Sequence, residues 1–279
     1  MRSDGRYLKN MDPMYKIAPY IMTERSDAMN MIELDIPLEP IQSYLNEKRK
    51  QGIHISHLAI VLAAYVRVLA EYPQLNRFVV NKRVYARNHI SVCMVVLKPG
   101  NYGDETEDKM YFDPADDIFA VNQKVIDYVE KNRQQGDVNE MDKVIKILTG
   151  IPGLLNIGVR VLKLLDRYGL MPKGIIEASP FHCSMVISNL ASLRTNHIFH
   201  HVYNFGTTSM VLTIGNSREV AVRRKGEIEF VKCMPFGVVM DERICTGSYY
   251  ALAFKRMKEY LSDPARLETP PTVVNEDVK

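Results

Sequence analysis

Three short stretches in the C-terminal third decide the fold of this chain: SMVISNL at residues 184–190, SMVLTIG at 209–215 and VMDERICTG at 239–247. The first two alternate in side-chain type with a period of two, which predicts β-strands over 184–190 and 209–214. The third continues a strand that runs into Val238 and then turns. A helix capped by Ser248 is expected to follow and to end at Asp263-Pro264.

The rest of the chain predicts further strands and helices in mixed order. Strands are expected over 30–36, 78–80, 84–86 and 90–97, and a hairpin over 219–224 and 227–232 across Lys225-Gly226. Helices are expected over 37–51, from a cap at Ser56 to Tyr72, and from Asp116-Asp117 to Gly136. Strands and helices that alternate in this way favour one α/β (α+β) domain.

The chain has 279 residues, of which 46% are hydrophobic and 25% charged, as in an ordinary globular protein. We expect an N-terminal arm over residues 1–27, a single domain over 28–267 and a disordered tail over 268–279. Residues 137–178 form an insertion-like region of two helical stretches, which stop at Gly150 and Gly169. Sequence repeats and a compositional linker are absent.

The charge and cysteine content exclude several classes of protein. A net charge of +3 without a dense basic stripe gives no reason to expect a nucleic-acid partner. The N-terminus lacks the apolar core of a signal peptide, and no apolar run approaches the roughly 18–20 residues that span a bilayer. The four cysteines follow no metal-binding spacing and are expected to be buried thiols. We therefore expect a cytoplasmic protein without membrane association.

Common catalytic and nucleotide-binding signatures, such as GxGxxG, GxxxxGK[ST], GxSxG and HExxH, are absent. Three of the seven histidines cluster, at His197, His200 and His201. A metal site would need carboxylate or thiolate partners nearby in space. We therefore expect these histidines to lie in a surface or interface loop and expect no metal.

The order of the motifs resembles the catalytic domain of the dihydrolipoyl acyltransferases of 2-oxoacid dehydrogenase complexes, which shares its fold with chloramphenicol acetyltransferase. In that family an ISNLG strand precedes a strand that ends in LGxG, then a hairpin, then a DHRxxDG or DHRxxNG turn and a helix. Residues 70–78, AEYPQLNRF, are also similar to the PELN segment of the family. The resemblance covers about residues 15–135 and 180–265.

This resemblance implies a two-layer α/β sandwich, with a mixed sheet flanked by helices, that assembles as a homotrimer. In the family, two subunits build each site. A histidine removes the proton from a hydroxyl or thiol, which attacks the thioester carbonyl of acyl-coenzyme A or acyl-lipoamide, and a serine donates a hydrogen bond to the oxyanion. The implied substrates are thus coenzyme A thioesters and a small acyl acceptor.

Matching the motifs position by position places the family's serine on Ser188. The aspartate and arginine of the turn fall on Asp241 and Arg243. The histidine, however, falls on Glu242, and the ordering Asp or Asn falls on Thr246. The positions of both the base and its organiser have therefore changed, while the residues around them match.

These replacements leave the activity open between an acyltransferase with an altered base and a catalytically inactive protein, a pseudoenzyme, that keeps the fold to bind a ligand or partner. A positioned base typically contributes about 10²–10⁴-fold to a rate. Because a glutamate in water has a pKa of about 4.3, it suits this task only when burial raises that pKa by two or more units. Ser188 also remains open to interpretation as a strand serine bonded to backbone, and Asp241 with Arg243 as a structural ion pair.

The insertion-like region leaves three alternatives. The last helix of this region is apolar on one side and carries Arg160, Lys163 and Arg167 on another. This face would pack on its own domain or on a neighbouring subunit. It would otherwise lie on a membrane surface or form a lid over the acyl channel.

Overall fold

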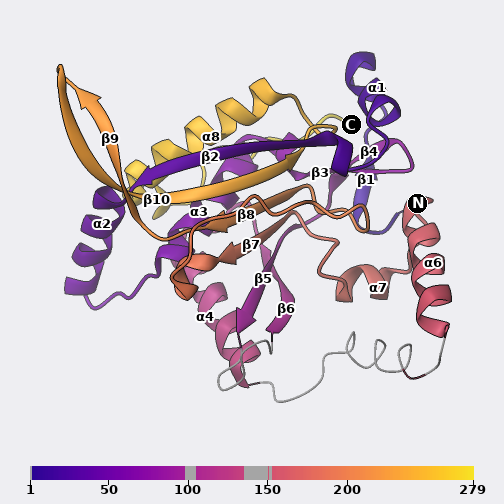
Figure 1. Cartoon of the computed structure of the whole chain (residues 1–279), viewed down its shortest axis with the longest axis horizontal. Coiled ribbons are helices and arrows are strands. Elements are labelled where there is room, and N and C mark those ends of the chain that lie inside the picture. Colours follow the sequence, from indigo (N-terminus) through magenta and orange to yellow (C-terminus); the bar gives the residue numbers. More distant parts are fainter. Residues whose placement is uncertain (1, 98–104, 135–149, 151–152) are drawn as a thin grey trace.

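The computed structural model describes residues 2–97, 105–134, 150 and 153–279 (Figure 1). Its larger sheet has seven strands, and six of them follow the order β2-β10-β8-β7-β5-β6, with β9 paired to β10. Neighbours β5 and β7, and β7 and β8, run parallel, whereas the other pairs are antiparallel. These strands are β2 (Met29–Pro37), β5 (Ile90–Leu97), β6 (Glu105–Phe112), β7 (Met185–Asn189), β8 (Met210–Ile214), β9 (Arg218–Arg224) and β10 (Glu227–Asp241).

Four helices cover one face of this sheet: α2 (Leu38–Lys50), α3 (His57–Glu71), α4 (Ile118–Gln134) and α8 (Gly247–Ser262) (Figure 1). Helix α3 is apolar almost all round and is buried from Ala59 to Ala70. The helices and sheet share one hydrophobic core, which includes Ile187, Leu212 and Val238. The prediction of a two-layer sandwich with a mixed sheet is confirmed.

The opposite face of the sheet is partly covered by the loop between β7 and β8. Val202 of this loop packs on Val211 and Val239, whose neighbours in sequence face the helices. Because side chains alternate across a strand, Ser188 lies on the same face as Val186, which contacts this cluster, and opposite to Ile187. Ser188 therefore belongs to the face that carries the loop.

Local signals predicted several boundaries correctly. Ser56 caps α3 by accepting a hydrogen bond from the amide of Ala59 at 3.0 Å. Asn81 and Lys82 both have positive φ, at 48° and 57°, as a two-residue hairpin between β3 (Arg77–Val80) and β4 (Arg83–Arg87) requires. The cap expected at Ser248 is wrong, because Thr246 accepts the hydrogen bond from the amide of Tyr249 and α8 begins at Gly247. All four cysteines are buried and free of disulfides.

The last part of the sheet differs from the predicted pattern. Residues 227–232 and the strand through Val238 form one strand, β10. Its first half pairs only with β9, and this two-stranded arm projects from the body (Figure 1). Its second half pairs with β2 and β8. Ile228 and Phe230 on the arm are exposed.

Both ends of the chain pack on the body, contrary to the surface arm and disordered tail that we expected. Strand β1 (Gly5–Tyr7) pairs with β4, and Leu8 is buried. In the tail, Asp277 forms an ion pair at 2.6 Å with the buried guanidinium of Arg77. The polar sequence of both ends led us to predict exposed segments, but their contacts are with residues far away in the sequence. The N-terminal segment also contains a helix, α1 (Pro13–Ile21).

The insertion-like region contains α6 (Leu154–Arg167) and α7 (Lys173–Ala178), whereas its first predicted helical stretch lies almost entirely outside the described residues. Helix α6 buries Asp166 but exposes an apolar stripe that includes Ile157, Val161 and Leu164. The described part of the chain thus leaves this stripe uncovered. Within the described ranges, no helix is long and apolar enough to cross a membrane.

Candidate active site

Ser188 lies near the C-terminal end of β7, in the middle of the sheet. Its neighbours are parallel strands on both sides, and it is in register with Thr213 of β8. The side chain is partly buried, and its hydroxyl makes no hydrogen bond to any other described residue. A strand serine bonded to backbone, which was one interpretation of the sequence, is therefore not observed. The hydroxyl is available to donate to a ligand.

The turn after β10 is held by a buried ion-pair cluster. Arg243 binds Asp241 through both carboxylate oxygens, with Nε at 2.8 Å and Nη2 at 2.7 Å. Arg25 adds a second guanidinium at 3.8 Å from Asp241, and burial lowers the pKa of Arg25 to about 10. The hydroxyl of Tyr250 donates to the Asp241 carbonyl at 3.0 Å. The predicted ion pair of Asp241 and Arg243 is thus present and fixes the backbone of the turn.

Glu242 is the residue that this rigid turn leaves without a partner. Its amide donates to the carbonyl of Ala28 at 2.8 Å, which anchors its backbone beside β2. Its side chain is partly exposed and makes no ion pair or hydrogen bond with the described residues. Thr246 has a structural role instead, as the N-cap of α8, and its hydroxyl lies 2.9 Å from that of Ser248. Glu242 therefore projects from a fixed backbone.

Within one chain, Ser188 and Glu242 lie at opposite ends of the sheet. Ser188 is in register with Thr213, which is in register with Gly237 of β10. Asp241 lies four residues beyond Gly237, or roughly 13 Å along the strand at about 3.3 Å per residue. Two strand spacings add about 10 Å across the sheet, so Ser188 and Asp241, the residue before Glu242, are roughly 16 Å apart. A single chain does not bring the predicted serine and the substituted base together.

The histidine cluster lies in the loop that covers the same face as Ser188. His197 is 3.5 Å from Glu33, which also binds Arg218. The Nδ1 atom of His200 is 2.9 Å from the carbonyl oxygen of His201. Because a carbonyl only accepts, Nδ1 of His200 is the donor in this hydrogen bond. Among the described residues, no three metal-ligating side chains come together.

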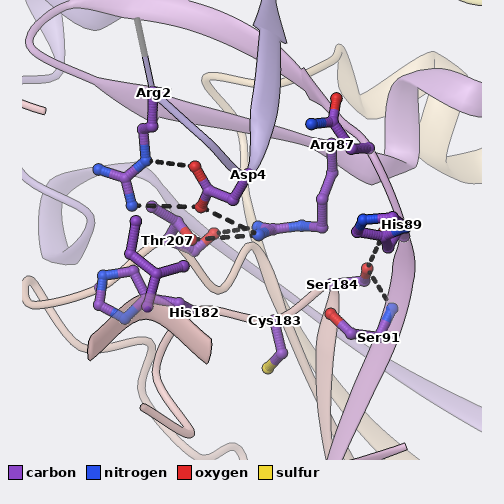
Figure 2. Close-up of polar contacts among 12 residues, drawn as sticks. Arg2, Asp4, Arg87, His89, Ser91, His182, Cys183, Ser184 and Thr207 are labelled. Atoms are coloured by element: carbon purple, nitrogen blue, oxygen red, sulfur yellow. Dashed lines mark hydrogen bonds and ion pairs between the residues drawn. The ribbon is translucent and has the colours of Figure 1, made fainter. Parts of the chain in front are cut away.

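A second polar cluster, which sequence reasoning missed, lies beneath α6 and α7. His182 contacts Asp166 through Nε2 at 3.0 Å and Ser179 through Nδ1 at 2.8 Å (Figure 2 shows His182). Burial lowers the pKa of His182, although the adjacent Asp166 opposes this shift. For Asp166, burial acts to raise the pKa, but hydrogen bonds from His182 and from the amide of Gly206 outweigh burial and lower it.

The composition of this cluster resembles a nucleophile, base and acid, but its setting is structural. Ser179, His182 and Asp166 are all buried, and Ser179 does not border a cavity described for the chain. The cluster fixes the entry into β7 and joins the inserted helices to the sheet. No short motif signals it, because its members come from α6, from the residue after α7 and from the segment just before β7.

Comparisons with known proteins agree with this architecture. Residues 182–269 match the sequence model of the catalytic domain of the 2-oxoacid dehydrogenase acyltransferases. A search of curated protein sequences found no match. A similar solved structure is the dihydrolipoamide acetyltransferase of Azotobacter vinelandii, at 12% identity and a TM-score of 0.60, covering 92% of this chain and 93% of that one.

Two further structures support the same fold. The cubic core of a pyruvate dehydrogenase multienzyme complex has 12% identity and a TM-score of 0.60, covering 86% of this chain and 83% of that chain. A chloramphenicol acetyltransferase has 14% identity and a TM-score of 0.55, covering 92% of this chain and 99% of that chain. The chain therefore has the fold shared by dihydrolipoyl acyltransferase catalytic domains and chloramphenicol acetyltransferase, and its residues 182–269 resemble that catalytic domain in sequence as well.

Proposed function

We propose that this protein transfers acyl groups from a thioester, such as acyl-coenzyme A, to a small hydroxyl or thiol acceptor at a site shared by two copies of the chain. The observation that carries this proposal is the pair of unpartnered groups, Ser188 and Glu242. One lies at each end of the sheet, and in one chain Ser188 is roughly 16 Å from Asp241, the residue before Glu242. Only a second copy can place a turn from residue 241 to 247 beside Ser188.

The family resemblance implies that this assembly is a homotrimer. The cubic core to which the chain is similar is itself an oligomeric assembly. Apolar side chains such as Phe230 on the β9–β10 arm and Ile157 on α6 are exposed in a single chain, as expected of surfaces that a neighbour covers. Light scattering at micromolar concentration should give three times the mass of one chain. A monomer would contradict the shared site.

The chemistry in this site divides between the two copies. The acceptor oxygen or sulfur attacks the thioester carbonyl and forms the new acyl bond, the carbon–sulfur bond to the thiol breaks, and the acceptor proton passes by way of a base to the departing thiolate. Ser188 donates its hydroxyl to the oxyanion that forms on the carbonyl oxygen. The Asp241–Arg243 pair fixes the backbone that presents Glu242, which we propose as the base. His200, in the loop that covers the same face as Ser188, is a second candidate for that base.

Release of free coenzyme A from acetyl-coenzyme A, measured with a panel of alcohol and thiol acceptors, tests this function. Removal of an oxyanion donor typically lowers turnover about 10²–10³-fold, and Ser188→Ala should do the same. Glu242→Gln and His200→Gln identify the base, because turnover should be lost in the variant from which the base has been removed. Turnover no higher than that of Ser188→Ala with every acceptor would contradict catalysis.

One observation favours the inactive alternative, in which the same fold binds a ligand or partner without turnover. Thr246 uses its hydroxyl to cap α8 and brings no carboxylate to the turn. A double variant, Glu242→His with Thr246→Asp, separates the two functions. If the native chain is silent but binds coenzyme A in calorimetry, and the double variant gains turnover, then the scaffold is intact and only the base is missing.

A further inference from the structure

A cavity of about 660 Å³ lies between the N-terminal segment, the end of β4, strands β5 and β6, and helix α7. Ser188, Glu242 and the turn after β10 are not part of its wall. Figure 2 shows some of its lining residues, among them Asp4, Arg87, His89, Ser91 and His182. Its volume is in the range of pockets that hold small organic molecules.

The charges around this cavity are not balanced. The buried cations are Arg2, Arg87 and Lys109, and the buried or mostly buried acids near them are Asp4 and Asp166. Three positive against two negative charges leave a formal +1. At the rim, Lys173 and Glu177 lie 3.6 Å apart and cancel each other. Burial of an uncompensated charge is costly, so the interior favours an anion.

Arg87 and Lys109, the two buried cations that line the cavity, also lack full sets of hydrogen-bond and ion-pair partners. Asp4 already binds Arg2 at 2.7 Å and lies 3.9 Å from Arg87. Arg87 donates to the hydroxyl and carbonyl of Thr207, and its buried Nε has no hydrogen-bond partner among the described residues. The ammonium of Lys109 donates to the carbonyl of Ile176 at 2.6 Å, and none of the described carboxylates forms an ion pair with it. Each therefore retains donors.

Neutral donors complete the wall. The Ser91 side chain and the Tyr111 hydroxyl border the cavity and make no hydrogen bond to other described residues. Burial lowers the pKa of Lys109 to about 8, as expected of an amine that lacks a nearby anion. Several N–H and O–H groups thus converge on one space that has an excess of positive charge.

We propose that this cavity binds a small organic molecule through an oxyanion, either a phosphate or a carboxylate group, held by Lys109 and Arg87 with Ser91 and Tyr111 as further donors. The bound oxyanion supplies the missing negative charge and accepts the free donors. The site is independent of the acyltransferase proposal, because it contains neither Ser188 nor the turn after β10.

Thermal unfolding in increasing inorganic phosphate or sodium acetate, with sodium chloride at matched ionic strength as reference, tests this site. A ligand that binds only the folded state raises the unfolding midpoint in a concentration-dependent manner. We expect phosphate, acetate or both to exceed chloride, and the stronger of the two identifies the chemical class. Equal curves for all three salts would overturn the proposal.

Variants then locate the effect. Lys109→Met should weaken the apparent affinity at least tenfold, whereas Lys109→Arg retains the charge and should retain binding. Tyr111→Phe removes a single hydroxyl and keeps the ring, so it should fold and weaken binding a few fold. Lys255→Met, which removes one exposed charge on α8 outside the cavity, is the control. An equal loss in Lys255→Met, or unchanged binding in both Lys109→Met and Tyr111→Phe, would show that the anion binds elsewhere.

Discussion

Two regions of this molecule bury charged side chains, but only one of them pairs those charges fully within the chain. In the turn after β10, the carboxylate of Asp241 meets two guanidinium groups and its own backbone carbonyl accepts from Tyr250. In the cavity beneath α7, Lys109 and Arg87 donate hydrogen bonds mainly to carbonyl and hydroxyl oxygens. Charges that are paired within the chain hold its backbone in place. Charges that are left partly unpaired in a cavity remain available to a ligand.

Removal of the central carboxylate of the turn should give the largest effect. Asp241→Ala leaves Arg243 and Arg25 buried without their acid, which typically costs about 3–5 kcal/mol in the free energy of unfolding. Urea unfolding measures this loss. The matched control is Glu242→Ala, one residue away, which removes no ion pair and should change stability by about 0.5 kcal/mol or less. Equal losses of stability in the two variants would show that Glu242 stabilises the turn as much as Asp241 does, contrary to this interpretation.

In the cavity, removal of the Lys109 charge should have the opposite effect and increase the free energy of unfolding. Burial lowers the pKa of Lys109 to about 8, below the roughly 10.4 of an unfolded lysine, with Arg87 adding to the shift and Asp4 opposing it. Between these two values the unfolded chain binds a proton that the folded chain does not, so this lysine favours unfolding at pH 7 and ceases to do so as the pH rises.

The variant Lys109→Met removes this unfavourable term. In buffer free of phosphate and carboxylate, it should be more stable than the native chain at pH 7 by on the order of 1–3 kcal/mol, and this advantage should shrink toward pH 10. Denaturant unfolding at several pH values measures the difference, and Lys255→Met should show no such trend. A difference that stays constant from pH 7 to 10 would mean that Lys109 is well compensated inside the fold.

The smallest effect is expected at the end of the turn, where Thr246 caps α8. Thr246→Ala should cost about 1 kcal/mol, since the amide of Tyr249 loses its acceptor. Thr246→Asp supplies both an acceptor and a negative charge at the helix N-terminus, so it should equal or slightly exceed the native stability. Thermal or urea unfolding of the three proteins checks the order, and a destabilised Asp variant would show that the turn needs the threonine methyl group.

Signals that act between near neighbours allowed much of the fold to be predicted. Ser56, the Asn81-Lys82 turn and the alternation over residues 184–190 each depend on the residues beside them. The order of four motifs then predicted the architecture. Pairings across long sequence distances could not be predicted in this way: Asp166 with His182, and Lys109 with the carbonyl of Ile176, come from an inserted region without a periodic partner. The Asp241–Arg243 ion pair was predicted from the sequence, and the site roles of Ser188 and Glu242 stay predictions. The placement of Ser188 and Glu242 at opposite ends of the sheet depends on strand order, which the sequence did not reveal.

The packed C-terminal segment links the end of the chain to the turn. Asp277 holds Arg77 through two oxygens, and the same guanidinium donates to the carbonyl of Ile244. The backbone carbonyls of Asp277 and Val278 also accept from Arg6. Deletion of residues 277–279 therefore alters the support of the loop that presents Glu242.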